Sequence, residues 1–374
     1  MSIVFFSISA IYFTLILLFI TGFYKVKKTV NINEEPKNSF SICIPFRNEA
    51  AHLNDLLHSL NNLNYPKNLY EVILVNDFST DDYKTVIQQF EHIKTFNLKL
   101  LSSQKKTNSP KKEALICAIN NASFEWIVAT DADCTVPKNW LLVFNQFIEH
   151  KNPYFISAPV KFKQEHSFLF HFQNLNFISL IGSSIGSFGI GKPIMCNGAN
   201  LCYKKTIVSS LNFFEGNENI ASGDDVFLLE KIHQNHPLQT HYLKCNEATV
   251  ITSAEKKLST FFHQQLRWAS KSGSYTNNFS KITALVVFLA TVSLVIQLIV
   301  SFLNTSYINI LLINFVIKFC VDFWLISKTA HFLKSTTSLL YFIPISILYP
   351  FFVVIISLLA PFKTFTWKER VFQK

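Results

Sequence analysis

Pairs of carboxylates at two places are the first candidates for chemistry in this sequence. Asp131 and Asp133 directly follow the apolar stretch 126–130, and Asp224 and Asp225 precede another apolar run. Two carboxylates two residues apart at the end of a strand can bind a hard divalent cation together with a diphosphate, although a D-x-D triplet also arises by chance. Asp225 can act as a general base, whereas Asp at a helix start more often only stabilises the helix.

Three further charged side chains lie where strands are expected to end and helices to begin. Asp77 stands at the tip of the apolar stretch 70–76, whereas the Ser, Thr and Asp residues after it are typical of a turn and a helix cap. Lys111 and Lys112 occupy the first turn of a helix that Pro110 begins, where cations oppose the helix dipole. Either both lysines are solvated, or an anion such as a phosphate makes their position favourable.

The segment 264–268 combines polar and aromatic groups with an amphipathic helical pattern. Apolar residues recur at helical spacing from Leu258 to Ala269, and basic side chains surround them. This pattern predicts a helix that lies on a membrane surface. Arg267 and Trp268 are in addition candidates for contact with a phosphorylated ligand.

These groups need a scaffold, and the sequence predicts an α/β domain with a mainly parallel sheet. Short apolar stretches typical of buried strands alternate with stretches of helical periodicity. The predicted strands are 39–45, 70–76, 98–102 and 125–130, and the predicted helices include 81–95 and 110–122. This alternation favours right-handed crossovers, and ligands bind such sheets beyond the carboxyl ends of the strands. No glycine-rich nucleotide motif follows the first strand, which argues against dinucleotide and ATP sites.

The composition indicates that this domain is attached to a membrane. Of 374 residues, 49% are hydrophobic and 16% are charged. This composition excludes a disordered chain, and it is more apolar than the composition that a wholly soluble protein requires. The net charge of +10 favours anionic lipids or phosphorylated substrates. We expect no nucleic-acid partner, because many lysines flank apolar segments. The seven cysteines are scattered and include no CxxC pair, which argues against zinc and disulfides and favours the cytosol.

The first apolar segment, 3–23, predicts a retained membrane anchor. It carries no charge and is followed by Lys25, Lys27 and Lys28. A cleaved signal peptide fits poorly, because the positive charges come after the apolar run. The positive-inside rule then places the next domain in the cytoplasm, which predicts an integral protein of the cell (inner) membrane.

Three more membrane segments are predicted near the C-terminus, at 282–303, 307–327 and 338–360. Lys318 and Asp322 lie inside the middle one at i and i+4, where they can pair, snorkel or face another helix. Four full spans would leave the C-terminus outside, whereas the basic tail favours the inside. A re-entrant or kinked last segment, broken by its two prolines, would reconcile the two.

Taken in order, these motifs resemble those of the family 2 glycosyltransferases, which are inverting membrane enzymes with a GT-A catalytic fold. The resemblance covers about residues 39–272 together with the flanking membrane segments. The matching elements are Pro45–Glu49, Asp77, Lys112–Leu115, Asp131–Asp133, Asn197–Asn200, Gly223–Asp225 and Gln264–Trp268. The chain departs from the family in having Asp224 where many relatives have Glu, and Phe46 where small residues are common.

The resemblance implies a role for each matching residue. Asp77 and Asp131 would contact the nucleotide, Asp133 would bind Mn²⁺ or Mg²⁺, and Asp225 would be the catalytic base. We assign Pro45, Arg47, Glu49 and Lys112 to the donor site as well, and Gly198, Asp224, Gln264, Arg267 and Trp268 to the diphosphate and acceptor. Such an enzyme would transfer a hexosyl or N-acetylhexosaminyl group from a nucleotide-sugar, expected to be a UDP-sugar, to a lipid or glycan acceptor at the membrane.

The predicted organisation has six parts. They are an anchor at 1–24, a basic and polar linker at 25–38, a GT-A domain at 39–253, an amphipathic interfacial segment at 254–280, a transmembrane region at 281–362 and a basic tail at 363–374. A processive polysaccharide synthase is the main alternative function, although such enzymes usually need more spans to form a channel. A non-catalytic membrane scaffold is a third hypothesis, and the intact carboxylates argue against it.

Overall fold

The computed structural model of the protein describes residues 1–28, 35–104, 109–211, 223–270, 276–362, 364–368 and 370–372. The chain forms two compact units. The α/β unit comprises Lys27–Lys163 and Met195–Ser253, and the helical unit comprises Met1–Val26, Gln164–Ile194 and Ala254–Lys374. The sequence-based division at 39–253 therefore differs at 164–194, which group with the helices. Parts of the linker, the interfacial segment and the tail, at 29–34, 271–275, 363, 369, 373 and 374, lie outside the described residues.

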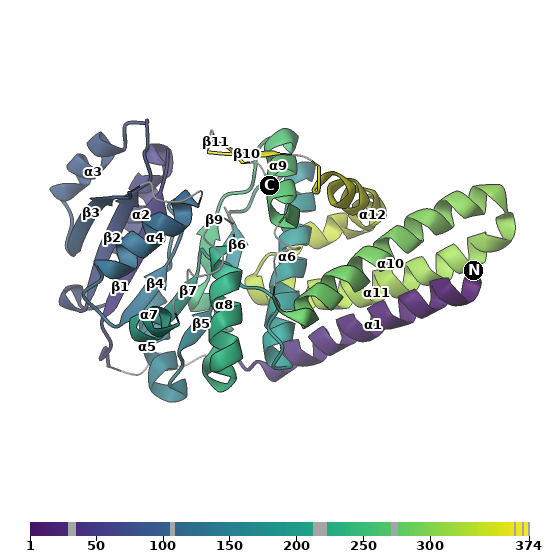
Figure 1. Ribbon diagram of the computed structural model, residues 1–374, viewed down its shortest axis with the longest axis horizontal. Helices are drawn as coiled ribbons and strands as arrows, with labels where there is room; N and C mark the ends of the chain where they lie inside the picture. The colour runs from purple at the N-terminus through teal and green to yellow at the C-terminus, as the bar shows by residue number, and fades with distance from the viewer. Residues whose placement is uncertain are drawn as a thin grey trace. The chain divides into compact units, whose positions relative to one another are not determined.

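The α/β unit is built on a seven-stranded, mostly parallel sheet with the order β3-β2-β1-β4-β7-β5-β8 (Figure 1). Its strands are β1 Phe40–Phe46, β2 Tyr70–Asn76, β3 Asn97–Ser102, β4 Trp126–Ala129, β5 Phe155–Ser157, β7 Leu201–Lys204 and β8 Thr240–Tyr242. Strands β1 to β4 are mutually parallel, and β7 runs antiparallel to both β4 and β5. A separate parallel pair consists of β6 Val160–Phe162 and β9 Val250–Thr252. The predicted fold class and the first four strands are confirmed.

Helices connect these strands as the periodicity predicts. They are α2 Ala50–Asn61, α3 Tyr83–Glu91, α4 Pro110–Asn120, α5 Trp140–Lys151, α7 Lys205–Ser210 and α8 Asp224–Asn235, with short 3₁₀ turns at Lys67–Leu69, Pro237–Gln239 and Asn246–Ala248. The leucines of α2 that recur at helical spacing, from Leu53 to Leu60, are fully buried. Helix α4 contacts β1, β2 and β3, so its first turn lies near the carboxyl ends of the parallel strands.

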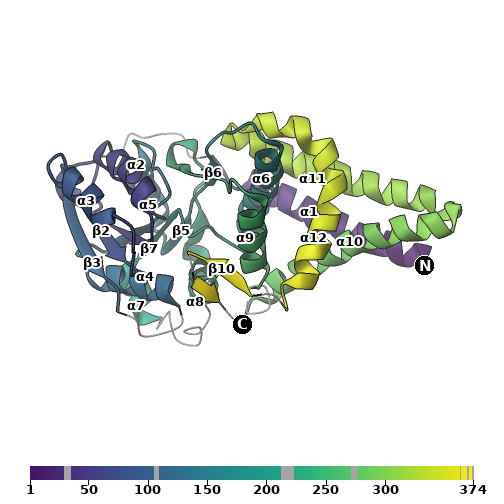
Figure 2. The same ribbon diagram turned by 90° about the horizontal axis from the view of Figure 1, so that it is seen from above.

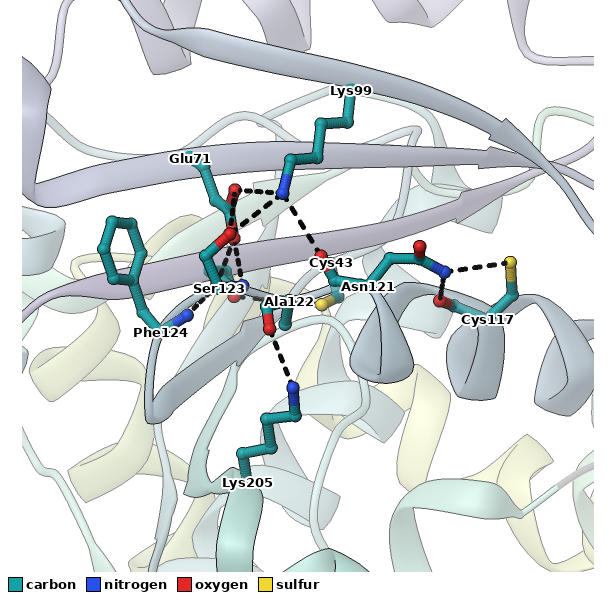
Figure 3. A network of polar contacts seen from close by, with 10 residues as sticks. Cys43, Glu71, Lys99, Cys117, Asn121, Ala122, Ser123, Phe124 and Lys205 are labelled. Atoms are coloured by element: carbon teal, nitrogen blue, oxygen red, sulfur yellow. Dashed lines mark hydrogen bonds and ion pairs between the residues drawn. The ribbon is translucent and has the colours of Figure 1, made fainter.

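A buried carboxylate near the start of β2 connects the central strands. Glu71 on β2 is 1% exposed and accepts hydrogen bonds from Ser41 Oγ at 2.7 Å and from Ser123 N at 2.6 Å. Lys99 Nζ on β3 lies 2.7 Å from its Oε2 (Figure 3). Burial opposes the charged form, but the hydrogen bonds from Lys99, Ser123 and Ser41 outweigh it and lower the pKa of Glu71. The ion therefore cross-links β1, β2, β3 and the turn before β4.

The helical unit contains the candidate membrane segments. Its helices are α1 Ser2–Lys25, α6 Phe168–Gly189, α9 Leu258–Ser270, α10 Asn278–Leu303, α11 Ile308–Leu333 and α12 Phe342–Leu359, with 3₁₀ turns at Thr305–Tyr307 and Thr336–Tyr341. Within the described residues, four helical segments are long and apolar enough to cross a membrane: Ser2–Lys25, Asn278–Leu303, Thr305–Leu333 and Thr336–Leu359. The long helices α1, α10 and α11 run side by side (Figure 2). The four predicted apolar segments are thus found as helices.

Helix α6, which the sequence analysis leaves inside the catalytic domain, packs closely against α1. A Cβ at Gly186 would lie 2.4 Å from the backbone oxygen of Phe19, and one at Gly22 would lie 2.0 Å from the backbone oxygen of Gly186. Only glycine permits the two helix backbones to approach this closely. The contact explains why 164–194 belongs to the helical unit although its polar residues argue against a span.

Polar side chains also join two of the candidate membrane helices. Lys318 and Asp322 form an ion pair on α11, and both contact Tyr12 OH on α1, Asp322 Oδ1 at 2.5 Å and Lys318 Nζ at 2.9 Å. Of the alternatives for these two charges, the structure shows pairing and contact with another helix. Such pairing lowers the cost of burying ions in the bilayer.

We expect that Glu71→Gln destabilises the α/β unit by ~1–3 kcal/mol, because Lys99 loses its counter-ion and one hydrogen bond becomes unfavourable. Since the pKa of Glu71 is lowered in the folded state, its contribution is present above the ordinary Glu pKa and is lost as the pH falls below it. Thermal unfolding of the solubilised protein, followed as a function of pH, measures both the loss of stability and its pH dependence. The matched control is Glu91→Gln, which removes the surface pair with Lys94 and should cost ~0–1 kcal/mol. Equal losses in both variants would contradict the structural role of Glu71.

Candidate active site

The carboxyl ends of β1, β2 and β4 meet at one edge of the sheet, and three of the predicted residues lie there. Phe46 and Asn76 are paired at the ends of β1 and β2, so Arg47 and Asp77 follow them at the same level. The N–H of Asp77 donates to the oxygen of Phe46 at 2.8 Å, which extends this pairing by one step. Strand β4 lies on the other side of β1, and Asp131 comes two residues after its end.

Arg47 fixes the loop that follows Asp77. Its Nη1 donates to the backbone oxygens of Asp77 and Phe78, at 2.9 and 2.5 Å. The N–H of Asn48 donates to Ser79 Oγ at 3.0 Å, which locks the loops after β1 and β2 to each other. Asp77 itself is 2% exposed. The contact that the resemblance implies between Asp77 and the nucleotide stays a prediction.

Pro45 and Glu49, on either side of Arg47, belong to the same scaffold. Pro45 is paired with Val75 in the register of β1 and β2. Glu49 is the residue before α2, is nearly buried, and has its Oε2 2.8 Å from His52 Nδ1. Both residues therefore lie at the predicted edge, and their contact with a donor stays a prediction.

The loop with the D-x-D triplet is held from both sides. Lys111 Nζ lies 2.6 Å from Asp131 Oδ1. Asp133 Oδ2 accepts a hydrogen bond from Thr252 Oγ1, the last residue of β9, at 3.3 Å. Just beyond, the backbone of Thr135 exchanges two hydrogen bonds with Ile251, of 2.8 and 3.0 Å. These contacts fix where the two carboxylates stand.

Lys111, next to Lys112 in the first turn of α4, is a candidate site residue to which the resemblance gives no role. Burial lowers the pKa of Lys111, but the carboxylates of Asp131, Asp224 and Asp225 together raise it above its ordinary value, so Lys111 carries a charge. Lys112 is buried, with its Nζ 5.8 Å from the ring centre of Phe227. Adjacent residues on a helix point about 100° apart, and the sequence pattern could not show that Lys111 contacts Asp131.

The second pair of carboxylates, Asp224 and Asp225, also acts electrostatically on Lys111. Asp224 and Asp225 form the first turn of α8, after Gly223 with a φ of 92°. The carboxylate of Asp225 accepts two backbone N–H bonds, from Gly198 to Oδ2 at 3.0 Å and from Val226 to Oδ1 at 2.9 Å. These two bonds fix the orientation of the carboxylate at the start of α8.

The turn that contains Gly198 is held in place by the buried side-chain amide of Asn200. Asn200 lies in the matching element Asn197–Asn200, but the resemblance gives it no role. Asn200 is fully buried, and its Nδ2 donates to the backbone oxygens of Pro159 and Ala248, both at 2.7 Å. Its Oδ1 accepts from Trp140 Nε1 at 3.0 Å. All polar groups of the side chain are used, so Asn200 holds the backbone that orients Asp225.

Gln264, Arg267 and Trp268 lie on α9, which belongs to the helical unit. Leu266 packs with Ile356 and Ala360 at the end of α12, as the apolar stripe of an amphipathic helix should. The helix is therefore as predicted, and the contacts of its three polar residues with donor or acceptor stay predictions.

The carboxylates fit a divalent cation that is shared with a substrate. Among the described residues there is no group of three or more His, Cys, Asp and Glu that would form a closed metal site. Mg²⁺ is usually held by one or two carboxylates together with substrate phosphates and water, and not by a cage made of protein alone. Asp133, with Asp131 beside it, supplies such an incomplete set.

Comparison with known proteins shows the family. The model described as "Glycosyl transferase family 2" matches residues 41–205, and "Glycosyl transferase family group 2" matches residues 126–360. TarS, the poly(ribitol-phosphate) beta-N-acetylglucosaminyltransferase of Staphylococcus aureus (strain Mu50), is 28% identical over 110 residues, which are 29% of this chain and 19% of TarS. The poly-beta-1,6-N-acetyl-D-glucosamine synthase of Staphylococcus aureus (strain COL) is 22% identical over 250 residues, 66% of this chain and 57% of the synthase.

One solved structure is similar over nearly the whole chain. The mannosyltransferase PcManGT from Pyrobaculum calidifontis, in complex with GDP-Man and Mn²⁺, covers 96% of this chain and 98% of its own, with a TM-score of 0.58 and 13% identity. This likeness supports the GT-A-like fold. Since the second family model spans more than half of the chain and the first spans the loops of the site, this protein belongs to the family 2 glycosyltransferases.

Proposed function

We propose that this glycosyltransferase moves a sugar from a nucleotide-sugar to a hydroxyl group of a membrane-associated lipid, with inversion at the anomeric carbon. The observation that carries the proposal is that Lys111 Nζ lies 2.6 Å from Asp131, and that the charges of Asp224 and Asp225 also act on Lys111. This supports a diphosphate site and a general base within electrostatic reach of the same lysine.

The leaving group is a nucleoside diphosphate, on which negative charge grows as the bond to the sugar breaks. Lys111, which is charged and contacts Asp131, would stabilise the negative charge on the leaving diphosphate by a hydrogen bond. Arg267 is a further candidate for this role. Mn²⁺ or Mg²⁺, held by Asp133 when bound, supplies additional positive charge beside the diphosphate. Asp131 orients Lys111 through their ion pair.

The acceptor hydroxyl must lose a proton as it attacks the sugar, and Asp225 is the proposed base. Its two backbone hydrogen bonds, from Gly198 and Val226, hold the carboxylate in a defined orientation at the start of α8. A Cβ at position 198 would lie 3.5 Å from Asp225 Oδ2, so the glycine keeps side-chain bulk away from this oxygen. A positioned base of this kind accelerates transfer by ~100- to 10,000-fold.

The names of the relatives favour an N-acetylglucosamine donor. Both TarS and the poly-beta-1,6-N-acetyl-D-glucosamine synthase handle this sugar by name, although the chain spans only 19% and 57% of them. We therefore propose a UDP-sugar of this class. To test it, membranes are incubated with a panel of UDP- and GDP-sugars, and the lipid extracts are analysed by mass spectrometry. A lipid that gains the mass of one N-acetylhexosamine is expected, and no product from any donor would contradict the proposal.

The likeness to a polymer synthase favours one alternative, a processive polysaccharide synthase. Four candidate spans within the described residues provide few helices for a polymer channel. Product length decides between the two functions. A ladder of products from one binding event would support the synthase, and a single addition would support the lipid-linked transferase.

We propose that the α/β unit faces the cytoplasm, because three lysines follow α1. A cysteine introduced at the exposed His92 should then resist a membrane-impermeant thiol reagent in intact cells. The matched control is a cysteine at the exposed Thr305, in the turn between α10 and α11, which this topology places outside. Labelling is compared with the parent protein, which has an exposed Cys320. Strong labelling at position 92 with none at position 305 would contradict this topology and indicate the opposite orientation.

We expect Asp133→Ala to remove metal-dependent turnover while the protein still folds. Its carboxylate accepts a hydrogen bond from Thr252, at 3.3 Å, and is only partly buried, in the loop after β4. Loss of a partly exposed loop side chain should cost about 0.5 kcal/mol of stability. The turnover of the variant and of the wild type is measured at increasing concentrations of Mn²⁺ and of Mg²⁺. The control Thr252→Val removes the hydrogen bond but keeps the carboxylate, and should retain most of the activity. An Asp133→Ala variant with unchanged metal dependence would show that the metal lies elsewhere.

For Asp225→Asn, turnover should fall by at least ~100-fold, because the amide cannot take a proton. Donor affinity should persist, since other groups hold the diphosphate. One of the two N–H bonds is lost, at a cost of about 1 kcal/mol in unfolding free energy. Asp224→Asn, next to it on α8, is the matched control and should be milder. Donor affinity, melting temperature and turnover are measured for both, and near-normal turnover of Asp225→Asn would end its assignment as the base.

A further inference from the structure

Phe78, directly after Asp77, has a backbone conformation that a bulky residue rarely adopts. Its φ is +53°, and its side chain is 48% exposed. The other non-glycine residues with positive φ in the described part of the chain are two asparagines and two lysines. Asparagine tolerates this region, whereas for an aromatic residue it is an outlier. Burial in the core does not account for Phe78, because half of its surface is open.

The surrounding loop imposes this conformation. Arg47 donates to the backbone oxygens of Asp77 and Phe78, which lie on either side of the Phe78 Cα. On the far side of Phe78, the N–H of Ser79 donates to Asn76 Oδ1 at 2.8 Å. Strain that neighbours enforce in this way is typical of functional sites. The loop thus holds an exposed aromatic ring in a defined place at the carboxyl edge of the sheet.

That place has a fixed relation to the candidate diphosphate site. Strands β2 and β4 flank β1, so they lie two strand spacings, about 10 Å, apart across the sheet. β4 ends beside Cys43 and β2 ends beside Phe46, so the tip of β2 also lies three residues, about 10 Å, further along the strand direction. Asp131 and Asp133 follow β4, and Phe78 follows β2. A nucleotide whose diphosphate lies at β4 and whose base extends across β1 would bring the base to Phe78.

We propose that the ring of Phe78 stacks against the nucleobase of the donor and gives the site its preference for nucleoside diphosphates over bare diphosphate. The inference rests on the proposed function, since it takes the diphosphate to lie at the D-x-D loop. Every base has a flat aromatic face, and stacking on an aromatic side chain is worth about a 10- to 100-fold gain in affinity.

The test compares two probes, UDP and inorganic pyrophosphate, each with Mn²⁺, on the purified full chain by titration calorimetry. In Phe78→Gly, UDP should bind about 10- to 100-fold more weakly, and pyrophosphate should bind as it does to the wild type. Melting temperature should stay equal or rise, because glycine adopts positive φ without strain. With the donor UDP-N-acetylglucosamine, KM should rise and kcat should change little. Phe78→Trp keeps a ring and should retain UDP affinity within about threefold.

Asn152→Gly is the matched control, because Asn152 has a φ of 43° at the end of α5, away from the carboxyl ends of the strands. It should leave both affinities unchanged. If Phe78→Gly binds UDP as tightly as the wild type, the stacking proposal is wrong while the proposed function stands. A rise in KM for the lipid acceptor alone would also overturn it. If the wild type binds pyrophosphate but none of UDP, GDP and ADP, the proposed function fails and the stacking proposal fails with it.

Discussion

The balance of charge around Lys111 is the constraint on which the site depends. Asp131 comes from the loop after β4, and Asp224 and Asp225 come from α8, almost a hundred residues later in the chain. Carboxylates that gather in one place repel each other unless a cation offsets them. Lys111 provides that cation from α4, a third element. A diphosphate brings further negative charge, which explains why the site also suits a divalent metal.

The scaffold keeps these groups in place by satisfying its own buried polar atoms. Glu71 and Lys99 join three strands, and Asn200 fixes the turn beside Asp225. Glu71 acts at the amino ends of the strands, and Asn200 acts next to the proposed base. Their precision matters because a base or a cation displaced by 1 Å loses much of its effect. The strained loop at Phe78 belongs to the same scaffold, since Arg47 holds both it and Asp77.

Much of this arrangement could be predicted from the sequence, because it depends on local patterns. The strands that end at Asn76 and Ala129 are uninterrupted apolar runs, and parallel pairing then places Asp77 and Asp131 at one edge. The choice between Lys111 and Lys112 could not be predicted, because it depends on the rotation of a helix against partners far away in sequence. The same holds for α6, whose His171 and Asn174 hydrogen-bond to Ser338, a residue more than 160 positions later.

The central claim is that Asp225 activates the acceptor for direct displacement of the nucleoside diphosphate. The stereochemistry of the product tests this claim most directly. The purified protein is given an α-linked, ¹³C-labelled UDP-N-acetylglucosamine and the lipid acceptor, and the anomeric coupling of the new bond is measured by NMR. A single displacement assisted by one base predicts a β-linked product. An α-linked product would contradict the role of Asp225 and require a different mechanism at this edge of the sheet.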